Sequence, residues 1–485
     1  MEQVLAVIEK ANAFVNDLVW GWPVIIMILG TGILLSVRMR FLQIRKFGYS
    51  FRNTIVATLK APGKKEGKDK KSVSQFEAFS AAISGTVGTG NIIGVTSAIL
   101  TGGPGAVFWM WVSAFFGMLT NYAENVLGLF FRKKNEKGEF CGGAMYYIYY
   151  GLKWKRLAYI AAGFCMFAAI GMSGVQTNKI SSTLSGAFRD VSAVDEKIVK
   201  LLVGICVSAL CAVCIIGGIK RIGRVASMLV PFMSVLFIGS AIFIVLTHVS
   251  ALPEAFASIF RYAFNFKAAG GGLMGYGFAQ VLRKGMARGV FSNEAGLGSS
   301  VIAHSASETK EPVVQGLWGI FEVFFDTFVI CTLSALTFLC TMDLSALTGA
   351  EADTDLSMQV FSSNFGVPGT VIFALILPLF AFTTILAWSY YGEKSTEFLF
   401  KNLGTKGKQT AVVVFKVLYV GLIIFSSVVE SELAWALSDT ANGLMAIPNL
   451  ICVVALSGLV TKITKNYFDR KKGADVKPMV SAYEE

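Results

Sequence analysis

Charged residues are scarce in this chain. Asp, Glu, Lys and Arg make up 15% of its 485 residues, whereas hydrophobic residues make up 54%. Soluble globular proteins carry about 25% charged residues, so the composition argues against a soluble fold. Apolar runs of about 20 residues recur, and this is the length that crosses the hydrocarbon core of a bilayer. The sequence predicts an all-α polytopic membrane protein. Long unbroken runs such as WPVIIMILGTGILLSV exclude a transmembrane β-barrel, whose strands alternate apolar and polar residues.

Histidine is rarer still, with only His248 and His304, both near the ends of expected spans. They indicate neither a zinc cluster nor a convincing proton relay, and the sequence holds no Ser-His-Asp arrangement or H-E-x-x-H motif. The eight cysteines are expected to be free, because Cys211 and Cys214 lie in an apolar run without a nearby histidine. The N-terminus lacks the basic start and cleavage site of a removable signal peptide. We therefore expect neither an enzyme nor a cofactor.

The net charge of +12 raises the question of nucleic-acid binding, which the placement of the basic residues answers. They cluster in loops, as Arg38, Arg40, Arg45 and Lys46; Lys64, Lys65, Lys68, Lys70 and Lys71; Arg132, Lys133, Lys134 and Lys137; Lys220, Arg221 and Arg224; Lys401, Lys406 and Lys408; and Arg470, Lys471 and Lys472. Apolar spans alternate between these clusters and poorly basic loops, which is typical of membrane proteins whose basic loops are cytoplasmic. No nucleic acid is expected as a partner, and no obligate protein partner is evident.

Eleven membrane spans are expected. They lie near residues 20–37, 75–100, 105–131, 158–187, 198–217, 225–247, 275–302, 313–340, 369–393, 411–430 and 436–460. The first span ends at a basic loop, so the N-terminus is predicted to lie outside. Eleven spans then bring the C-terminus into the cytoplasm, and we expect a plasma-membrane protein.

Five segments follow from these spans. They are 1–74 (an amphipathic segment, one extra transmembrane helix and a basic cytoplasmic loop), 75–247 (a first set of five spans), 248–274 (an outer-face amphipathic connection), 275–460 (a second set of five) and 461–485 (a cytoplasmic tail). Because five is odd, the second set enters the membrane from the opposite side, which permits an inverted repeat. The first span of each set is interrupted, by SGTVGTGNIIG in one and by ARGVFSNEAGLGSS (287–300) in the other. Paired Gly-broken spans at corresponding places point to the midplane site of a secondary transporter.

A broken helix survives in a membrane only where it is buried or lines a cavity, and it offers specific chemistry there. A half-helix that starts near Thr89, Gly90 and Asn91 directs bare N–H groups and its positive end at the break, which suits a carboxylate. The freed carbonyls of residues 84–87 suit a sodium ion or an ammonium group. Close helix packing is the alternative explanation for the glycines of one such segment. The second broken segment favours a binding site.

Polar residues in other spans complete the set of candidates. Thr383, Thr384 and Trp388 lie in the span 369–393, and Thr384 and Trp388 share a helix face. The two hydroxyls either bond back to their own helix or complete an oxygen shell around Na⁺. Gln176 is an amide at membrane depth that we expect to face the bundle. The acids within spans are Glu77, Glu124, Glu294, Glu322, Asp326 and Asp439, of which Glu294 stands out because it lies in the second break.

Several segments resemble a known family. GGPGAVFWMWVSAFFG (Gly102–Gly117) is similar to the signature of the alanine or glycine:cation symporters, and GTVGTGNIIGV, FSNEAGLGS and FAFTTILAWSYYGE resemble other hallmark segments in the same order. The resemblance covers roughly residues 15 to 465. It implies a LeuT-type fold, with ten core helices in two inverted five-helix repeats and one extra helix before them.

The resemblance also implies the role of individual residues. Thr89, Gly90 and Asn91 would hold the substrate carboxylate, and carbonyls around Gly85, Thr86 and Phe291 the ammonium group. The walls of the pocket, whose aromatic bulk leaves room for a small side chain, would be Gln176, Phe291, Thr384 and Trp388. A sodium ion would bind backbone oxygens of Ser84, Val87 and Phe380 and the hydroxyls of Thr383 and Thr384.

These features together predict a sodium-coupled symporter that imports alanine and/or glycine by alternating access, with Na⁺ as the coupling ion and no cofactor. The alternative is a sodium- or proton-coupled transporter of another neutral amino acid such as glutamine, which some members of the family are thought to prefer. A membrane-embedded enzyme or a channel is a more remote alternative.

Overall fold

The computed structural model describes residues 2–60, 72–188, 194–264, 277–343, 354–429 and 432–483. Several predictions therefore fall outside the described residues. These are the basic cluster Lys64, Lys65, Lys68, Lys70 and Lys71, residues 265–274 of the amphipathic connection, the first two residues of the span 275–302 and the last residue of the span 411–430.

The chain is helical almost throughout the part described. Its first half forms α1 (Glu2–Val19), α2 (Trp22–Arg38), α3 (Leu42–Arg45), α4 (Phe47–Phe51), the π-helix η1 (Arg52–Val56), α5 (Ala57–Lys60), α6 (Gln75–Thr86), the 3₁₀-helix η2 (Thr89–Asn91), α7 (Ile93–Gly102), α8 (Ala106–Phe130), strands β1 (Lys133–Lys134) and β2 (Phe140–Cys141), α9 (Ala144–Tyr146), the π-helix η3 (Tyr147–Gly151), α10 (Lys155–Phe188), α11 (Glu196–Ile216) and α12 (Gly218–Thr247). Its second half forms α13 (Leu252–Ala263), α14 (Phe278–Asn293), α15 (Val301–His304), α16 (Pro312–Val323), the π-helix η4 (Phe324–Cys331), α17 (Thr332–Thr341), α18 (Thr354–Phe365), α19 (Val367–Leu399), α20 (Gly404–Val428) and α21 (Glu432–Lys471).

Eight helices in the described part are long and apolar enough to cross a membrane, and the bent pair α6–α7 makes nine. The count of eleven is therefore not confirmed by length and hydropathy. The expected spans 105–131 and 275–302 are the ones missing from this set. The second of them is divided between α14 and α15. The first, α8, carries Asn121, Glu124 and Asn125, which are fully buried against neighbouring helices, so its polar face lowers its mean hydropathy without facing lipid.

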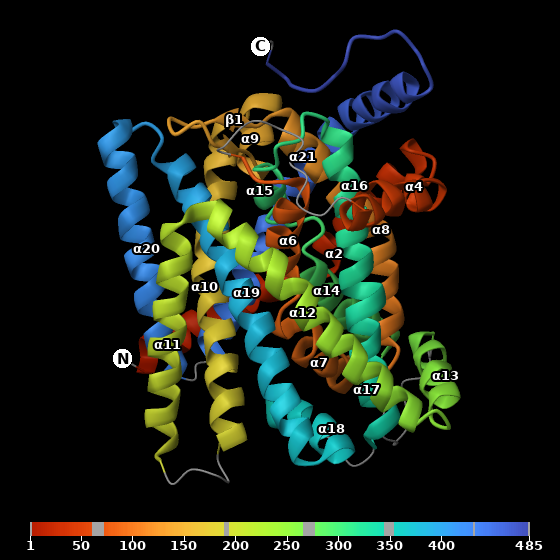
Figure 1. The fold of residues 1–485 in the computed structure, drawn as a ribbon, viewed down its shortest axis with the longest axis vertical. Helices are drawn as coiled ribbons and strands as arrows, with labels where there is room; N and C mark the ends of the chain where they lie inside the picture. Colours follow the sequence, from red (N-terminus) through yellow and green to blue (C-terminus); the bar gives the residue numbers. More distant parts are fainter. Residues whose placement is uncertain are drawn as a thin grey trace.

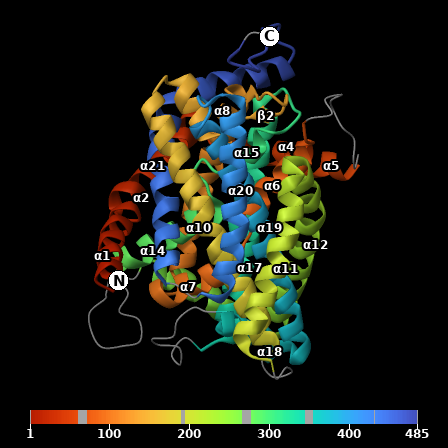
Figure 2. The ribbon, with the colours of Figure 1, turned by 90° about the vertical axis from the view of Figure 1, so that its left-hand side faces the viewer.

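The helices form one elongated bundle (Figures 1 and 2). Long helices, among them α10, α19 and α20, run along its length, and the shorter pieces α6, α7, α14 and α15 lie between them (Figure 1). The C-terminus lies at one end of the bundle, which also holds the β1–β2 hairpin, α9 and the loop after α15 (Figure 1). We call this end the C-terminal face. Within the expected amphipathic connection 248–274 the chain forms the helix α13, which lies toward the opposite end of the bundle (Figure 1).

The first predicted interruption is confirmed between α6 and α7. The helix α6 starts at a capping box, in which Ser74 and Glu77 bond each other's backbone N–H groups at 3.2 and 2.9 Å. It ends at Thr86 because Val87 takes an extended conformation, with φ −80° and ψ 91°. After the short turn η2, the chain resumes as α7, and the two segments are bent by 58°.

The second predicted interruption is confirmed between α14 and α15. Glu294 ends α14 in a left-handed conformation with φ 55°, and Gly296 and Gly298 follow at φ 98° and 72°. Glycine tolerates this region because it has no Cβ. Residues 294–300 thus cross the middle of the bundle without regular structure before α15 begins at Val301. The two breaks leave backbone groups of both segments free for other partners.

Several contacts close the C-terminal face. Val73, just before α6, forms a parallel bridge with Ser307 after α15, through Val73 N to Ala306 O at 3.4 Å and Glu308 N to Val73 O at 2.8 Å. The guanidinium of Arg132 donates to the carbonyls of Ser307 and Thr309, both at 2.6 Å. The ends of the two broken helices are therefore tied to each other on this face.

Candidate functional site

The backbone of the first break lies directly against α14 and α19. A Cβ placed on Gly88 would lie 2.6 Å from Thr384 Oγ1 and 3.5 Å from Gln176 Nε2. A Cβ on Gly90 would lie 3.5 Å from the ring of Phe291. Glycine at these positions therefore lets side chains of three other helices approach the backbone. The structure brings together four of the predicted site residues or their neighbours, although they are distant in sequence.

Gly85, about one turn before Gly88, is in similarly close contact with α19. A Cβ there would lie 2.8 Å from the hydroxyl of Tyr391 and 3.3 Å from Cβ of Ala387, both on α19. The Tyr391 hydroxyl also donates to the carbonyl of Ala82 at 3.5 Å. The end of α6 is thus held against α19, the helix that carries Thr384 and Trp388.

Gln176, on α10, reaches the start of the turn η2. Its Oε1 accepts a hydrogen bond from Thr89 N at 3.4 Å, which is a long bond, and its side chain is buried. Thr89 lies at the positive end of the helix that continues into α7. The arrangement leaves an N–H group of the break weakly bonded at the place where the sequence predicts a carboxylate.

The predicted sodium ligands are buried residues at the end of α6 and in α19. Ser84, Val87, Phe380, Thr383 and Thr384 are all fully buried. Within α19, the hydroxyls of Thr383 and Thr384 donate to the carbonyl of Phe380 at 3.0 and 2.9 Å. On α6, Ser84 and Thr86 likewise donate to Ala81 and Ile83 of their own helix, at 2.8 and 3.1 Å. Each hydroxyl oxygen keeps lone pairs that a hard cation can use.

The Asn91 side chain is bonded at both ends within the protein. Its Oδ1 accepts from Gly88 N at 2.9 Å, and its Nδ2 donates to Asp326 Oδ1 at 2.6 Å and lies 3.4 Å from Cys331 Sγ. In this arrangement Asn91 holds the turn of the break in place. Its expected contact with a substrate carboxylate stays a prediction.

Asp326, on η4, joins the two breaks. Besides Asn91, it accepts hydrogen bonds from the hydroxyls of Ser292 and Thr327, both at 2.9 Å, and it is fully buried. Ser292 is the second-last residue of α14, directly before the second break. The sequence marked Asp326 only as one of six acids within spans, and nothing in it indicated Ser292 or Cys331 as partners. The apolar run around Asp326 was the signal, because a carboxylate there needs an internal partner.

Glu294, in the second break, lies close to Trp388 of α19. Glu294 is 2% exposed and accepts from Ser299 Oγ at 2.5 Å, so the break is braced by its own side chains. Trp388 is 1% exposed, its ring lies 5.4 Å from that of Tyr391, and its indole N–H approaches the carboxylate of Glu294. The side chains of the second break therefore reach α19.

The residues of the first break and its neighbours differ in burial. Gly90 and Phe291 are partly exposed, whereas Thr89, Thr384 and Trp388 are buried. The guanidinium of Arg288 lies 5.6 Å from the centre of the Phe291 ring, one turn away along α14.

His304 has an acidic partner that the sequence did not reveal. Its Nε2 lies 2.7 Å from Glu322 Oε2, and its Nδ1 lies 2.6 Å from Gln315 Nε2. All three side chains are fully buried. The sequence indicated neither of these partners, and the expectation that the histidines form no proton relay stays a prediction.

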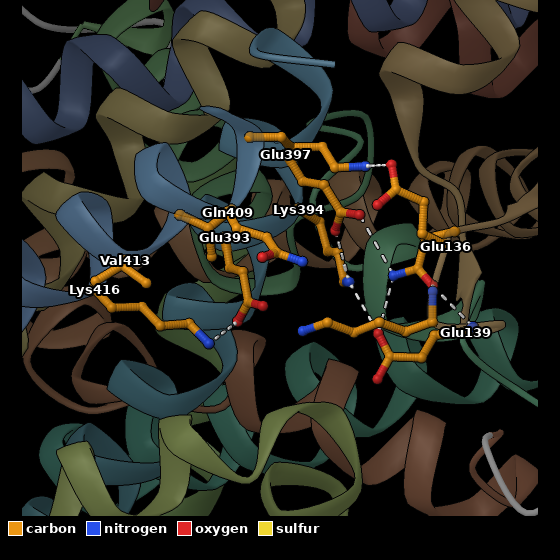
Figure 3. A pocket seen from close by; sticks show the side chains of 12 residues that line it. Glu136, Glu139, Glu393, Lys394, Glu397, Gln409, Val413 and Lys416 are labelled. Carbon is orange, nitrogen blue, oxygen red and sulfur yellow. Dashed lines mark hydrogen bonds and ion pairs between the residues drawn. The ribbon is translucent and has the colours of Figure 1, made fainter. Parts of the chain in front are cut away.

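A charged pocket of about 300 Å³ opens on the C-terminal face, apart from the breaks (Figure 3). Lys394, near the end of α19, bonds Glu397 at 2.9 Å and Glu139 of the hairpin at 3.5 Å. Burial acts to raise the pKa of Glu139, but the Lys394 ammonium and a hydrogen bond from Asn135 hold that pKa below its usual value. Lys408 of α20 pairs with Glu136 of the hairpin at 2.8 Å. The ion pairs in this pocket join residues of different elements, and they link the β1–β2 hairpin to α19 and α20.

Sequence comparison places relatives along nearly the whole chain. A sequence model described as the sodium:alanine symporter family matches residues 5–481. The sodium/alanine symporter AgcS of Methanococcus maripaludis is 39% identical over 464 residues, which is 94% of this chain and 97% of the relative. The probable sodium/glutamine symporter GlnT of Bacillus subtilis is 34% identical over 472 residues, which is 97% of this chain and 92% of the relative.

Structure comparison finds a similar fold at low sequence identity. The crystal structure of MhsT in complex with L-phenylalanine superposes with a TM-score of 0.56 and 14% identity, over 81% of this chain and 98% of that one. This likeness shows the fold, which is that of LeuT-type transporters.

Proposed function

This chain belongs to the sodium:alanine symporter family, and on that premise we propose that it imports alanine and/or glycine together with Na⁺ by alternating access. The family consists of amino-acid transporters that use Na⁺ as coupling ion, and its members are not enzymes. The observation that carries the proposal is the first break, where Gly88 and Gly90 bring bare backbone against Thr384 and Phe291.

The substrate site of this proposal lies at that break. The carboxylate binds N–H groups of Thr89 and Gly90, with Asn91 positioning the turn, because the start of a helix attracts anions. The ammonium group binds carbonyls around Gly85, Thr86 and Phe291. The walls are Gln176, Phe291, Thr384 and Trp388, and the indole N–H of Trp388 is directed to the carboxylate of Glu294. The two large aromatic side chains favour a small substrate.

The sodium site of this proposal lies beside the substrate site. Its ligands are backbone oxygens of Ser84, Val87 and Phe380 and the hydroxyls of Thr383 and Thr384. Support comes from the burial of all five residues and from the contact of α6 with α19. Because Thr384 belongs to both sites, binding of Na⁺ and substrate would stabilise the same arrangement of the break.

The state of the transport cycle is assigned from the face of the bundle that is closed. We propose that the C-terminal face is cytoplasmic, that the N-terminus lies outside, and that the segments 75–247 and 275–460 are inverted repeats of five spans each. In this proposal the contacts of the C-terminal face close the cytoplasmic side, and the bridge between Val73 and Ser307 must break for release. Inward movement of Na⁺ supplies about 2.3 kcal/mol per charge per 100 mV of membrane potential.

Uptake into proteoliposomes tests the proposal. The purified protein is assayed with Gly, L-Ala, D-Ala, Ser and Gln, with and without a Na⁺ gradient. Saturable, Na⁺-dependent uptake of alanine or glycine is the expected result. Preference for glutamine would favour the alternative substrate, which the similarity to GlnT supports. Uptake that persists without Na⁺ and is abolished by a protonophore would contradict sodium coupling.

A further inference from the structure

The pair of His304 and Glu322 is buried, and no ion pair of either side chain with a lysine or arginine is found in the part of the chain that the structure describes. His304 ends α15, which follows the second break, and Glu322 lies on α16. In the orientation found, the amide of Gln315 donates to Nδ1 of the imidazole, so the imidazole proton is on Nε2 and points to Glu322 Oε2. The hydroxyl of Ser300 also approaches the carboxyl group of Glu322.

The proton count of the pair determines its charge. A neutral imidazole with an ionised carboxylate leaves one negative charge in the dry interior. One more proton makes the pair neutral, either as imidazole and carboxylic acid or as imidazolium and carboxylate. Burial of a net charge is strongly unfavourable. The closed, dry structure therefore favours the form with the additional proton.

The acidic groups around the pair act in the same direction, although the hydrogen bond from Ser300 opposes them. Glu124 of α8, Glu294 at the second break, Asp326 of η4 and Tyr391 of α19 all interact electrostatically with Glu322. The carboxyl groups among them repel a second negative charge. On the side of the pair that faces the C-terminal face, the guanidinium of Arg132 donates to the carbonyl of Ser305 at 3.2 Å.

Other charged side chains of the packed elements have partners of their own. The carboxylate of Glu77, on α6, bonds Ser74 N. Arg470 of α21 and Glu311 before α16 form a two-pronged ion pair at 2.7 and 2.8 Å. Among the described residues, the proton is thus the cation best placed to neutralise the pair.

The position of the pair connects it to the closure of the C-terminal face. His304 is followed directly by the residues whose carbonyls Arg132 holds, and by Ser307, which is bridged to Val73. Opening of this face would separate these segments and admit water to the pair. Water stabilises the charged form, so the additional proton is bound more weakly in the open state.

We propose that His304 and Glu322 form a proton-binding site that holds one proton more when the C-terminal face is closed than when it is open. Loss of this proton at alkaline pH leaves a buried negative charge and favours opening. The proposal rests on the proposed transport cycle only for its effect on uptake; closure of the face can be measured without substrate.

Hydrogen exchange provides the first test. Purified protein in Na⁺ is compared at about pH 6 and about pH 9, with rates corrected for intrinsic exchange, for peptides that contain residues 300–310. The wild type should exchange about fivefold or more faster at the higher pH. Glu322→Gln, which mimics the neutral carboxyl group, should remove this difference. Equal responses of wild type and Glu322→Gln would overturn the proposal.

The second histidine provides a matched control. His248, at the end of α12, bonds the carbonyl of Ile244 and lies far along the chain from any break. His248→Gln should leave the exchange response unchanged, whereas His304→Gln should reduce it. In ¹⁵N-histidine-labelled His248→Gln protein the single imidazole signal reports His304 directly. The chemical shift of that signal should change with pH. Its pH dependence should differ in the double variant that carries both His248→Gln and Glu322→Gln. A signal that is constant from about pH 5.5 to 9 would refute the site even where Glu322→Gln alone fails to fold.

Uptake provides the functional readout. In proteoliposomes, the Na⁺ concentration for half-maximal uptake should rise about fivefold or more between pH 6 and 9 in wild type and His248→Gln, and stay constant in Glu322→Gln. If no amino acid is taken up at all, the proposed transport function fails, while the exchange and imidazole signals still decide the proton site. If uptake is Na⁺-dependent but its pH profile is unchanged by Glu322→Gln, the proton site is not coupled to transport.

Discussion

At the scale of single residues, the closest contacts of the site involve glycines rather than side chains with evident chemistry. Gly88 lies against Thr384, and no atom other than hydrogen fits between them. By contrast, a Cβ on Gly94, in the following helix α7, would meet nothing within 4 Å. Gly88 and Gly94 belong to the same expected span, so only their three-dimensional surroundings distinguish them. This pair allows a controlled test of the break.

Gly88→Ala should abolish or strongly reduce uptake. The added methyl group would displace Thr384 or the backbone, and overpacking of this kind costs about 1–3 kcal/mol. The measurement is the initial rate of Na⁺-dependent alanine uptake, normalised to the amount of folded protein. Gly94→Ala is the control and should transport like the wild type. Full activity of Gly88→Ala would show that the contact with Thr384 is not needed.

Thr384→Val should weaken the dependence of uptake on sodium. Valine keeps the shape of threonine but removes an oxygen of the proposed sodium site, so half-maximal uptake should need a several-fold higher Na⁺ concentration. Thr337→Val is a matched control, because the Thr337 hydroxyl is also buried and donates within its own helix, to Ser334 O at 2.8 Å. Unchanged Na⁺ activation in Thr384→Val would contradict the assignment of the site.

Trp388→Ala should admit larger amino acids. The change removes a fully buried aromatic wall, and the space of its ring becomes available to a longer substrate side chain. Competition of unlabelled leucine and glutamine against alanine uptake measures this. Phe373→Ala, on the same helix but packed against Phe361, is the control for loss of a buried ring. An unaltered substrate profile would mean that Trp388 does not bound the pocket.

At the scale of elements, the two broken helices act as a pair. Asp326 joins their breaks through Asn91 and Ser292, and the bridge of Val73 to Ser307 joins their ends on the C-terminal face. Movement of one broken helix would therefore disturb the other at two places. The hairpin β1–β2 adds a further connection, because its ion pairs with α19 and α20 lie on the same face (Figure 3).

Arg132→Gln should loosen the C-terminal face. It removes a charged donor from the carbonyls of Ser307 and Thr309, and a hydrogen bond of this type is worth about 1.5–3 kcal/mol. Hydrogen exchange of residues 300–310 should become about tenfold faster or more, since 1.4 kcal/mol corresponds to a factor of ten. Arg261→Gln, which breaks an exposed pair with Glu254 on α13, is the control. Equal exchange in both variants would argue that Arg132 does not hold the face closed.

At the scale of the whole molecule, the spans and the breaks were predictable from the sequence, and the contacts between them were not. Runs of apolar residues and the glycines at residues 85–90 and 296–298 indicate helices and interruptions directly, because both depend on local chemistry. The partners of Asp326 and His304 depend on residues tens to hundreds of positions away. Helix α8 shows the same limit, since its polar face is explained only by the helices that cover it.

The sequence by itself determined that this protein is a membrane bundle with two interrupted helices, and its motifs identified the family. Hydrophobicity and backbone freedom act over a few residues, so they can be read along the chain. Only the tertiary structure decided which face is closed, that Asn91 is bonded to Asp326, and that His304 is paired with Glu322. In a dry interior each buried polar group requires a partner, and the packing of the helices selects that partner.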